Sequence, residues 1–370
     1  MTVSNKAICT FYYIASLLFL LAFWYTSVQH MHNWAGGLLA LSFVSIALAF
    51  RGSRYFKGYW YSVVILAVAT IAMYYPQYFI SVGGRNASFF IPILLQVIMF
   101  GMGTELSLKD FAQVMRMPKG VIIGTACHYI IMPLVGFAVA HLFNFPNEIA
   151  AGIILIGCCP SGLASNVMCY LAKANLALSV SVTTISTLLA PFLTPLLMKF
   201  LGGNYVEIDL WAMVWDITKI VILPIAAGLA FHYLVRGKIK WLDKIMPVIS
   251  MVGIALVLLV ITAAGRDNLL KIGGLLIIAT FIHNISGYFL GYWSARLFRF
   301  PEKDCRTIAL EVGMQNAGLA SALAKGMGKI ATVGLASVIF GTMMNVTGSS
   351  LASWWHSRPP HDEPTEKELQ

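Results

Sequence analysis

The chain has 370 residues, of which 59% are hydrophobic and 11% are charged, and its mean hydropathy is +0.79. Soluble domains carry about 25% charged residues, so this composition indicates a polytopic membrane protein and excludes a soluble enzyme. The formal net charge of +10 would suggest nucleic-acid binding in a soluble protein. Here the placement of the positive residues along the chain gives a better explanation.

Twelve apolar stretches follow one another, each close to the length of about 20 residues that crosses a bilayer. Their centres lie at Phe19, Leu41, Val68, Val97, Ile131, Leu155, Thr187, Leu223, Leu258, Ile282, Gln315 and Phe340. We therefore expect an all-α protein with twelve transmembrane spans. The first span follows Lys6 as a signal peptide would, but it lacks a small-residue cleavage site, so we expect a retained helix.

The positive residues are distributed unevenly between the two sides of the membrane. With the N-terminus in the cytoplasm, most of the 25 Lys and Arg residues fall on the cytoplasmic side. Those on the other side are Arg85, Lys199, Lys219, Arg266, Lys271, Lys325 and Lys329. This bias predicts that both termini are cytoplasmic and that the protein lies in a cell membrane, the inner membrane of a bacterium. Anionic lipid headgroups are the expected partners of the charge, and nucleic acid is not.

Small polar residues interrupt the apolar stretch from Cys158 to Pro191. Pro160 and Gly162 are followed by a series of Ser, Thr and Asn side chains, at a depth where an unbroken helix would be expected. In hydrocarbon, every backbone N–H and C=O group needs a partner, so a break is tolerated only inside protein or beside a wet cavity. Broken helices at this depth are where transporters bind ions and substrates.

Internal similarity suggests an inverted repeat. The ten spans from Lys57 onward divide into two halves of five, which gives the halves opposite topology. PSGLASN at 160–166 resembles QNAGLAS at 315–321, and His128 corresponds to His283, at an offset of about 155 residues. A third GLAS at 334–337 shows that helices rich in small residues also produce such matches by chance.

Glu311 is an acidic residue well inside a span, in the segment TIALEVGMQNAGLASALA. An intramembrane carboxylate is costly unless it is paired or binds a cation, so it indicates a functional site. Gly313 and Gly318 indicate that this helix also breaks. Ser179 and Thr183 are four residues apart and would present their hydroxyl groups on one helix face, although such hydroxyls often bond the preceding helical turn instead.

Two other residue types have structural explanations. All six cysteines lie in or beside apolar spans, so we expect free, buried thiols, and the adjacent Cys158 and Cys159 are a weak indication of metal binding. His128 and His283 lie deep in spans, where a buried histidine is usually neutral and hydrogen-bonded.

These motifs carry a family resemblance. GCCPSGLASNVMCYLAKANLALSVSVTTISTLLAPFLTP and EVGMQNAGLASALA resemble the two core motifs of the bile acid:sodium symporter family in its bacterial branch. IMFGMGTELSLKDF and HNISGYFLGY extend the resemblance over roughly Lys57 to Trp355. It implies an inverted-repeat secondary transporter with two crossing broken helices. The panel domain would comprise 57–118 and 205–265, and the core 119–204 and 266–356. Residues 1–56 would add two transmembrane helices, and 357–370 would form a cytoplasmic tail.

The resemblance also implies binding residues at matching positions. A first sodium site would use Ser165, Asn166, Ser179, Thr183 and Glu311. A second would use Glu311, Val312, Met314 and Gln315 together with a glutamine side chain, but the position of that glutamine is His128 in this chain. The substrate region would include Asn316 and Asn345, and Leu163 stands where some bacterial relatives have a threonine.

His128 changes what the second site could do. An imidazole has no oxygen ligand, so the second site is absent, weakened, completed by water, or replaced by protonation of His128, with proton and sodium competing for one role. The alternative is that His128 is a neutral packing residue.

Together these features predict sodium-coupled import of an organic anion, such as a bile acid, a pantoate-like or a keto-acid carboxylate, by alternating access. The oligomeric state is left open, and Na⁺ is the expected cofactor. Alternatives are a proton-coupled or mixed carrier and a non-transporting sensor or channel. An intramembrane enzyme is not expected, because the chain shows no nucleophile and base pair.

Overall fold

The computed structural model describes residues 3–53, 56–106, 114–235, 240–358 and 360. Part of the IMFGMGTELSLKDF motif, residues 107–111, and most of the expected tail, residues 361–370, lie outside this description. The fold is all-α with one small hairpin, so the sequence-based prediction of an all-α polytopic membrane protein is confirmed.

The first half of the chain contains the following elements, with η marking 3₁₀ and π turns. They are α1 (Val3–Val28), α2 (His32–Gly52), η1 (Lys57–Tyr59), α3 (Trp60–Tyr74), α4 (Gln77–Ile80), β1 (Ser81–Val82), β2 (Arg85–Asn86), η2 (Ala87–Phe89), α5 (Phe90–Glu105), α7 (Pro118–Leu142), α8 (Asn147–Cys158), α9 (Ala164–Leu171), α10 (Leu176–Leu197) and η3 (Met198–Gly202). The β1–β2 turn uses Gly83 and Gly84 at φ of 58° and 78°, a region that glycine adopts without strain.

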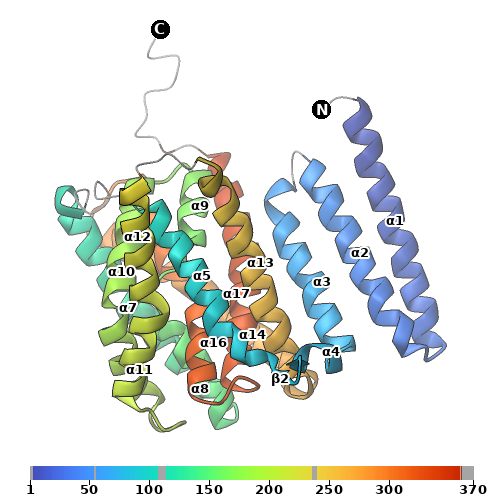
Figure 1. The fold of residues 1–370 in the computed structure, drawn as a ribbon. Helices are drawn as coiled ribbons and strands as arrows, with labels where there is room; N and C mark the ends of the chain where they lie inside the picture. Colours follow the sequence, from blue (N-terminus) through green and yellow to red (C-terminus); the bar gives the residue numbers. More distant parts are fainter. Residues whose placement is uncertain (1–2, 54–55, 107–113, 236–239, 359, 361–370) are drawn as a thin grey trace.

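The second half continues the helical pattern. Its elements are α11 (Leu210–Ile217), η4 (Thr218–Ile222), α12 (Leu223–Val235), α13 (Lys240–Ala264), α14 (Arg266–Leu297), α15 (Glu302–Gly313), α16 (Ala317–Gly326) and α17 (Val333–His356). Figure 1 shows that α1 begins and α17 ends at the same end of the bundle.

Eight helical segments within the described residues are long and apolar enough to cross a membrane. They are Ile8–Val28, Asn33–Gly52, Ala87–Glu105, Pro118–Leu142, Leu176–Gly202, Leu210–Val235, Arg266–Leu297 and Val333–His356. The four other predicted spans coincide with α3, with the shorter apolar part of α13 (Val248–Ala264), and with the interrupted pairs α8/α9 and α15/α16. Because each pair is interrupted, its two halves are separately too short to cross a membrane.

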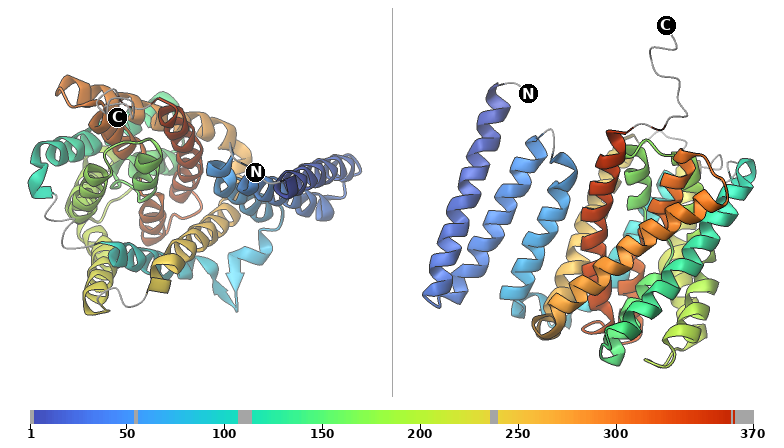
Figure 2. Two further views of the ribbon diagram at one scale, coloured as in Figure 1. Left: turned by 90° about the horizontal axis from the view of Figure 1, so that it is seen from above. Right: turned by 180° about the vertical axis from the view of Figure 1, so that it is seen from behind.

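The two N-terminal helices form a hairpin beside α3, at one side of the bundle (Figures 1 and 2). The hydroxyl of Ser16 on α1 lies 2.9 Å from that of Ser42 on α2. At the α2–α3 contact, Gly36 lies so close to Tyr74 that an added Cβ would meet the tyrosine Cβ at 2.3 Å. The α1 helix packs on α2 and leaves most of its own surface exposed, which suits a lipid-facing helix.

A first group of helices is formed by α3, α5, α12 and α13. Backbones of α5 and α12 approach closely, because an added Cβ at Gly103 would lie 2.2 Å from the carbonyl oxygen of Ile225. The α3 and α13 helices are joined by the hydroxyl of Tyr61, which donates to the carbonyl of Met251 at 2.7 Å. Glycine-mediated contact of this kind is typical of transmembrane helix packing.

A second group repeats one pattern twice: a long helix, an interrupted helix and another long helix. The first copy is α7, α8/α9 and α10, and the second is α14, α15/α16 and α17. Both α8 and α15 are 12 residues long and follow a proline, Pro146 and Pro301, which cannot donate a backbone hydrogen bond. This matched succession agrees with the predicted internal repeat.

The two interruptions cross each other in antiparallel fashion. Ser161 and Gln315 form an isolated β-bridge. The backbone N–H of Gly162 donates to the carbonyl of Met314 at 3.1 Å, and that of Asn316 donates to the carbonyl of Pro160 at 2.8 Å. The breaks therefore satisfy each other's backbone groups inside the protein, as an apolar surrounding demands.

Candidate functional site

The carboxylate of Glu311 is completely buried beside the crossing and is surrounded by hydroxyl groups. Ser165 and Ser179 donate to its Oε1, each at 2.5 Å. Thr183 donates to its Oε2 at 2.8 Å. No ion pair joins Glu311 to a cationic side chain in the described part of the chain. The negative charge therefore has hydrogen-bond donors but no balancing charge from the protein.

Asn166 completes the cluster from the other side. Its Oδ1 lies 2.7 Å from the Ser179 hydroxyl and 3.5 Å from that of Thr183. Ser165 also lies 2.8 Å from the carbonyl of Gly162. Each hydroxyl has a single hydrogen, so the three hydroxyl groups cannot donate to every oxygen that surrounds them. The cluster is rich in oxygen and short of hydrogen, which is the composition of a hard-cation site.

Local structure explains how these side chains meet. Ser165 and Asn166 lie in the first turn of α9, directly after the break, and Glu311 lies in the last turn of α15, directly before the other break. Ser179 and Thr183 share one face of α10, whose start is fixed by the side chain of Asn175, which accepts from the N–H of Leu178. All five residues predicted for the first sodium site are therefore brought together.

The carbonyl groups released at the break in α15 are occupied by donors from the protein itself. The carbonyl of Val312 accepts from Nε2 of Gln315 at 2.8 Å, and that of Gly313 accepts from Nδ2 of Asn284 at 2.8 Å. The carbonyl of Met314 accepts from the N–H of Gly162, as described for the crossing. Three residues predicted for the second sodium site thus surround the break, but their backbone oxygens already accept hydrogen bonds. The side-chain Oε1 of Gln315 is buried without a partner.

His128 lies between the two breaks and faces backbone groups. Its Nδ1 is 2.9 Å from the carbonyl oxygen of Glu311, and its Nε2 is 2.8 Å from that of Cys159. His128 therefore contacts the main chain of Glu311 and not its carboxylate. A neutral imidazole can donate to only one of these two carbonyls. The ring fills the position where the family resemblance implies a glutamine.

The predicted substrate residues have separate places around the crossing. The side chain of Asn316 caps α16 by accepting from the N–H of Leu319 at 3.0 Å. Asn345 lies on α17, where its amide donates to the carbonyl of Gly341 at 2.7 Å. Leu163 is half-buried immediately before α9. No hydrogen bond joins the three within the described structure.

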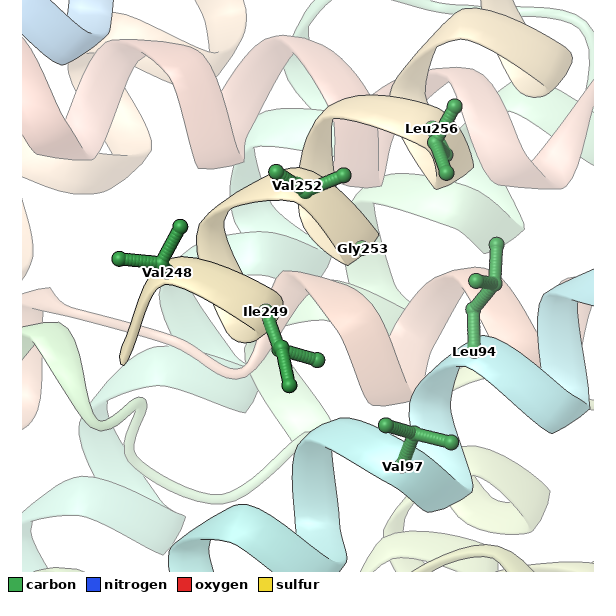
Figure 3. Close-up of a pocket in the computed structure, with 7 residues that line it drawn as sticks. All are labelled: Leu94, Val97, Val248, Ile249, Val252, Gly253 and Leu256. Atoms are coloured by element: carbon green, nitrogen blue, oxygen red, sulfur yellow. The ribbon is translucent and has the colours of Figure 1, made fainter. Parts of the chain in front are cut away.

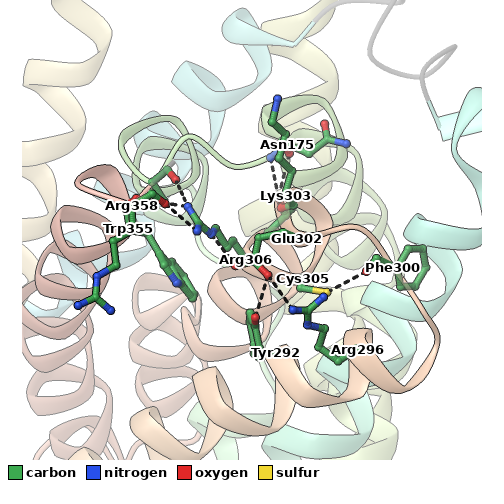
Figure 4. Close-up of polar contacts among 12 residues, drawn as sticks. Asn175, Tyr292, Arg296, Phe300, Glu302, Lys303, Cys305, Arg306, Trp355 and Arg358 are labelled. Atoms are coloured by element: carbon green, nitrogen blue, oxygen red, sulfur yellow. Dashed lines mark hydrogen bonds and ion pairs between the residues drawn. The ribbon is translucent and has the colours of Figure 1, made fainter. Parts of the chain in front are cut away.

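A second polar cluster ties the α15 start to the neighbouring helix ends (Figure 4). Buried Arg306 donates to Glu302 at 2.8 Å and to the carbonyl of Arg358 at 2.8 Å, and its guanidinium also reaches the carbonyls of Ala172 and Trp355, each at 3.3 Å. At the start of α8, the carboxylate of Glu148 accepts hydrogen bonds from Lys329 and Thr332, which lie in the loop after α16. Each interrupted helix is therefore fastened to the loop that follows the other.

One open hollow lies elsewhere, between α5 and α13 (Figure 3). Its volume is about 220 Å³, and every side chain that lines it is apolar. It therefore offers nothing that would bind a cation or an anion. Within the described residues, no cluster of three or more His, Cys, Asp or Glu side chains could hold a metal ion, and all six cysteines are free and buried.

Known proteins resemble this chain over most of its length. A protein of Bacillus subtilis with the name "Uncharacterized sodium-dependent transporter YocS" is 39% identical over 309 residues, which cover 83% of this chain and 94% of that protein. The profile of the Sodium Bile acid symporter family matches residues 92–272.

The chain belongs to the sodium bile acid symporter family.

Other members of this symporter family are more distant. A rice protein named "Probable sodium/metabolite cotransporter BASS1, chloroplastic" is 36% identical over 266 residues, which cover 72% of this chain and 65% of that protein. A rabbit protein named "Ileal sodium/bile acid cotransporter" is 35% identical over 243 residues, which cover 63% of this chain and 68% of that protein. The names of these proteins describe sodium-dependent transport or sodium cotransport, and the two that name a cargo name a metabolite and a bile acid.

Sequence reasoning did not single out several residues that support the site. Asn284 holds the carbonyl of Gly313, and Thr194 donates to the carbonyl of Cys158 at 2.7 Å, so each break has a side-chain donor at the end of its first half. A polar residue inside an apolar span was the available signal, and Asn284 does lie within the HNISGYFLGY motif. Its role depends on which helix it faces, and that was not visible from the sequence.

Proposed function

We propose that this member of the symporter family imports an organic anion and couples the import to Na⁺. The observation that carries this proposal is the buried Glu311 carboxylate, which has three hydroxyl donors and no cationic partner among the described side chains. Burying an unbalanced carboxylate at membrane depth costs several kcal/mol, and a bound cation removes that cost. The names of related proteins, one a sodium-dependent transporter and one a sodium/bile acid cotransporter, support the choice of Na⁺.

Na⁺ would be held by Ser165, Asn166, Ser179, Thr183 and Glu311. All five supply oxygen atoms, and a single carboxylate matches the charge of a monovalent ion. Hydroxyl groups can donate to the carboxylate and still offer lone pairs to the ion. Because the ligands come from α9, α10 and α15, ion binding would hold the two interrupted helices together.

One coupled Na⁺ is the stoichiometry that the contacts favour. In the second position, the carbonyls of Val312 and Met314 accept from Gln315 and Gly162, and the carbonyl of Glu311 lies 2.9 Å from Nδ1 of His128. Replacing these donors by a cation would leave the ring of His128 facing the ion without an oxygen ligand. The protein's own donors therefore take the place of a second ion.

The substrate would be a small or amphipathic carboxylate, of the bile acid, pantoate-like or keto-acid type. The α9 and α16 helices both begin at the crossing, and helix N-termini present N–H groups and a positive dipole to an anion. Asn316 and Asn345, which the family resemblance places in the substrate region, would orient the anion. Leu163, which replaces a hydroxyl donor found in some relatives, makes this side of the pocket less polar.

Transport would proceed by movement of the core, 119–204 and 266–356, against the panel, 57–118 and 205–265. Support comes from the packing, because α5 joins α12 and α13 closely, whereas α7 to α10 pack with α14 to α17. The hairpin of α1 and α2 contacts α3 and would move with the panel. Both termini would face the cytoplasm.

Uptake into proteoliposomes tests this proposal directly. The purified chain should accumulate a carboxylate, chosen by a thermal-shift screen of organic anions, when an inward Na⁺ gradient is imposed. An equal K⁺ gradient and empty liposomes should give no accumulation. Uptake that is independent of Na⁺ but driven by a proton gradient would establish the proton-coupled alternative. Downhill flux of the anion that is coupled to neither ion would indicate a channel.

A further inference from the structure

A chain of hydrogen bonds connects the break in α15 with α17. Asn284, completely buried on α14, donates its Nδ2 to the carbonyl of Gly313 at 2.8 Å. Its Oδ1 lies 2.5 Å from the hydroxyl of Thr347 on α17. A carbonyl can only accept and a hydroxyl can donate, so both ends of the amide meet suitable partners. One side chain thus joins three helices.

The surrounding packing leaves this connection little freedom. An added Cβ at Gly313 would lie 2.2 Å from the ring of Tyr288, and one at Gly287 would lie 2.9 Å from the Cα of Gly313. The hydroxyl of Tyr288 lies 3.2 Å from the carbonyl oxygen of Met344 and 3.4 Å from the side-chain hydroxyl of Thr347, on the same face of α17. The last turn of α15 is therefore pressed against α14, and Tyr288 of α14 in turn contacts α17.

Gly313 lies two positions after Glu311, and Thr347 lies two positions after Asn345. The bridge accordingly runs from the turn that carries the proposed cation ligand to the turn that carries the proposed substrate ligand. Neither Asn284 nor Thr347 contacts a side chain of the sodium cluster in the described structure. An effect of these two residues on sodium binding would have to pass through the backbone of the break.

We propose that Asn284 and Thr347 are positioning residues that hold the α15 break against α17 and transmit cation binding at Glu311 to α17. This inference rests on the proposed sodium site. Without the bridge, the carbonyl of Gly313 loses its buried donor, and the last turn of α15 gains freedom that sodium binding must then remove. Sodium affinity falls as a result, and α17 no longer responds to the ion.

The test measures the Na⁺ concentration that gives half-maximal thermal stabilisation of the purified full chain. Asn284→Ala should raise it about tenfold, equivalent to about 1.4 kcal/mol, and Thr347→Val about threefold. Because the residues act in series, adding Thr347→Val to Asn284→Ala should change it no further. Thr347→Ser, which keeps the hydroxyl, should have the same half-saturating Na⁺ concentration as wild type.

Thr342→Val is the matched control. Thr342 lies on the same helix and its hydroxyl bonds only the preceding turn, at the carbonyl of Val338, 2.9 Å away. It should leave the half-saturating Na⁺ concentration unchanged. A purely structural role for Asn284 would lower the melting temperature without Na⁺ and leave the half-saturating concentration as in wild type.

Hydrogen exchange of the α17 amides measures the transmission itself. Saturating Na⁺ should slow exchange across residues 333–356 in wild type, and this protection should be lost in Asn284→Ala and Thr347→Val. Unchanged half-saturation in both variants, or unchanged Na⁺ protection of α17, overturns the bridge while the sodium site stands. A wild-type protein that Na⁺ does not stabilise overturns the sodium site first.

Discussion

Ser165 and Glu311 are 146 residues apart in sequence, and the hydroxyl of the first lies 2.5 Å from a carboxylate oxygen of the second. They belong to different interrupted helices, one residue standing just after its break and the other just before. The contact exists only when the two breaks cross. Binding of a cation here would therefore require the crossing and would stabilise it.

Removing one hydroxyl from the cluster should weaken sodium binding without abolishing it. Thr183→Val keeps the side-chain shape but removes the group that lies 2.8 Å from Oε2 of Glu311. A lost ligand and hydrogen bond are worth about 1.5 kcal/mol, so the half-saturating Na⁺ concentration should rise roughly tenfold. Titration calorimetry with Na⁺ measures this. Thr184→Val is the control, since the hydroxyl of Thr184 bonds only the carbonyl of Val180; an equal effect of both changes would contradict the assignment.

The crossing depends on the absence of a side chain at Gly162. An added Cβ would lie 2.6 Å from the carbonyl oxygen of Gln315, a backbone atom that cannot turn away. Gly162→Ala should lower stability by about 1 to 3 kcal/mol or prevent folding. Gly274→Ala, at a helical glycine with no atom within 4 Å of the added Cβ, should be neutral or stabilising. Thermal unfolding in detergent compares the two, and equal melting temperatures would show that the crossing has room for the methyl group.

His128 should set the number of bound sodium ions. In wild type its ring covers the carbonyls of Glu311 and Cys159, so Na⁺-dependent stabilisation should show a Hill coefficient of about one. His128→Gln supplies an amide oxygen and frees one carbonyl, so a second ion can bind and the coefficient should exceed one. Two cooperative ions in wild type, unchanged in the variant, would refute the idea that His128 replaces the second ion.

Arg306 should be the most stabilising cation of the Figure 4 cluster. Arg306→Ala removes a buried guanidinium from Glu302 and from three carbonyls, which should cost about 3 to 5 kcal/mol. Arg296→Ala removes a more exposed cation, 3.4 Å from the same Glu302, and should cost about 1 kcal/mol or less. The melting temperatures of the two variants test this prediction. A loss of melting temperature in Arg306→Ala no larger than in Arg296→Ala would indicate a surface role for Arg306.

The sequence was sufficient to locate the breaks and most of the site. Pro160 and Gly162 interrupt an apolar run, which indicates the first break. Glu311 places a carboxylate at membrane depth, where an unpaired carboxylate is costly, and this indicates the second place. The hydroxyl pair of Ser179 and Thr183 followed from helical spacing. Ser165 and Asn166 stood among the small polar residues after the first break, and the family motifs match these same positions.

Contacts between helices could not be predicted in the same way. Whether Asn284 faces the break or the lipid depends on the rotation of α14, which is set by Gly287 packing on Gly313. Besides Glu302, the partners of Arg306 are backbone carbonyls from two other segments, which carry no sequence signal. The orientation of His128 toward main-chain oxygens, and not toward the carboxylate, likewise follows from the crossing.

Equilibrium binding of radioactive ²²Na⁺ to the purified protein, in wild type and in Glu311→Gln, tests the central claim most directly. Glutamine keeps the size of the side chain and its hydrogen bonding to the hydroxyl groups, but removes the charge that balances the ion. We expect wild type to bind Na⁺ saturably, in competition with unlabelled Na⁺ and not with K⁺, and folded Glu311→Gln to bind none. Saturable binding of undiminished affinity in Glu311→Gln would contradict the assignment of the sodium site to Glu311.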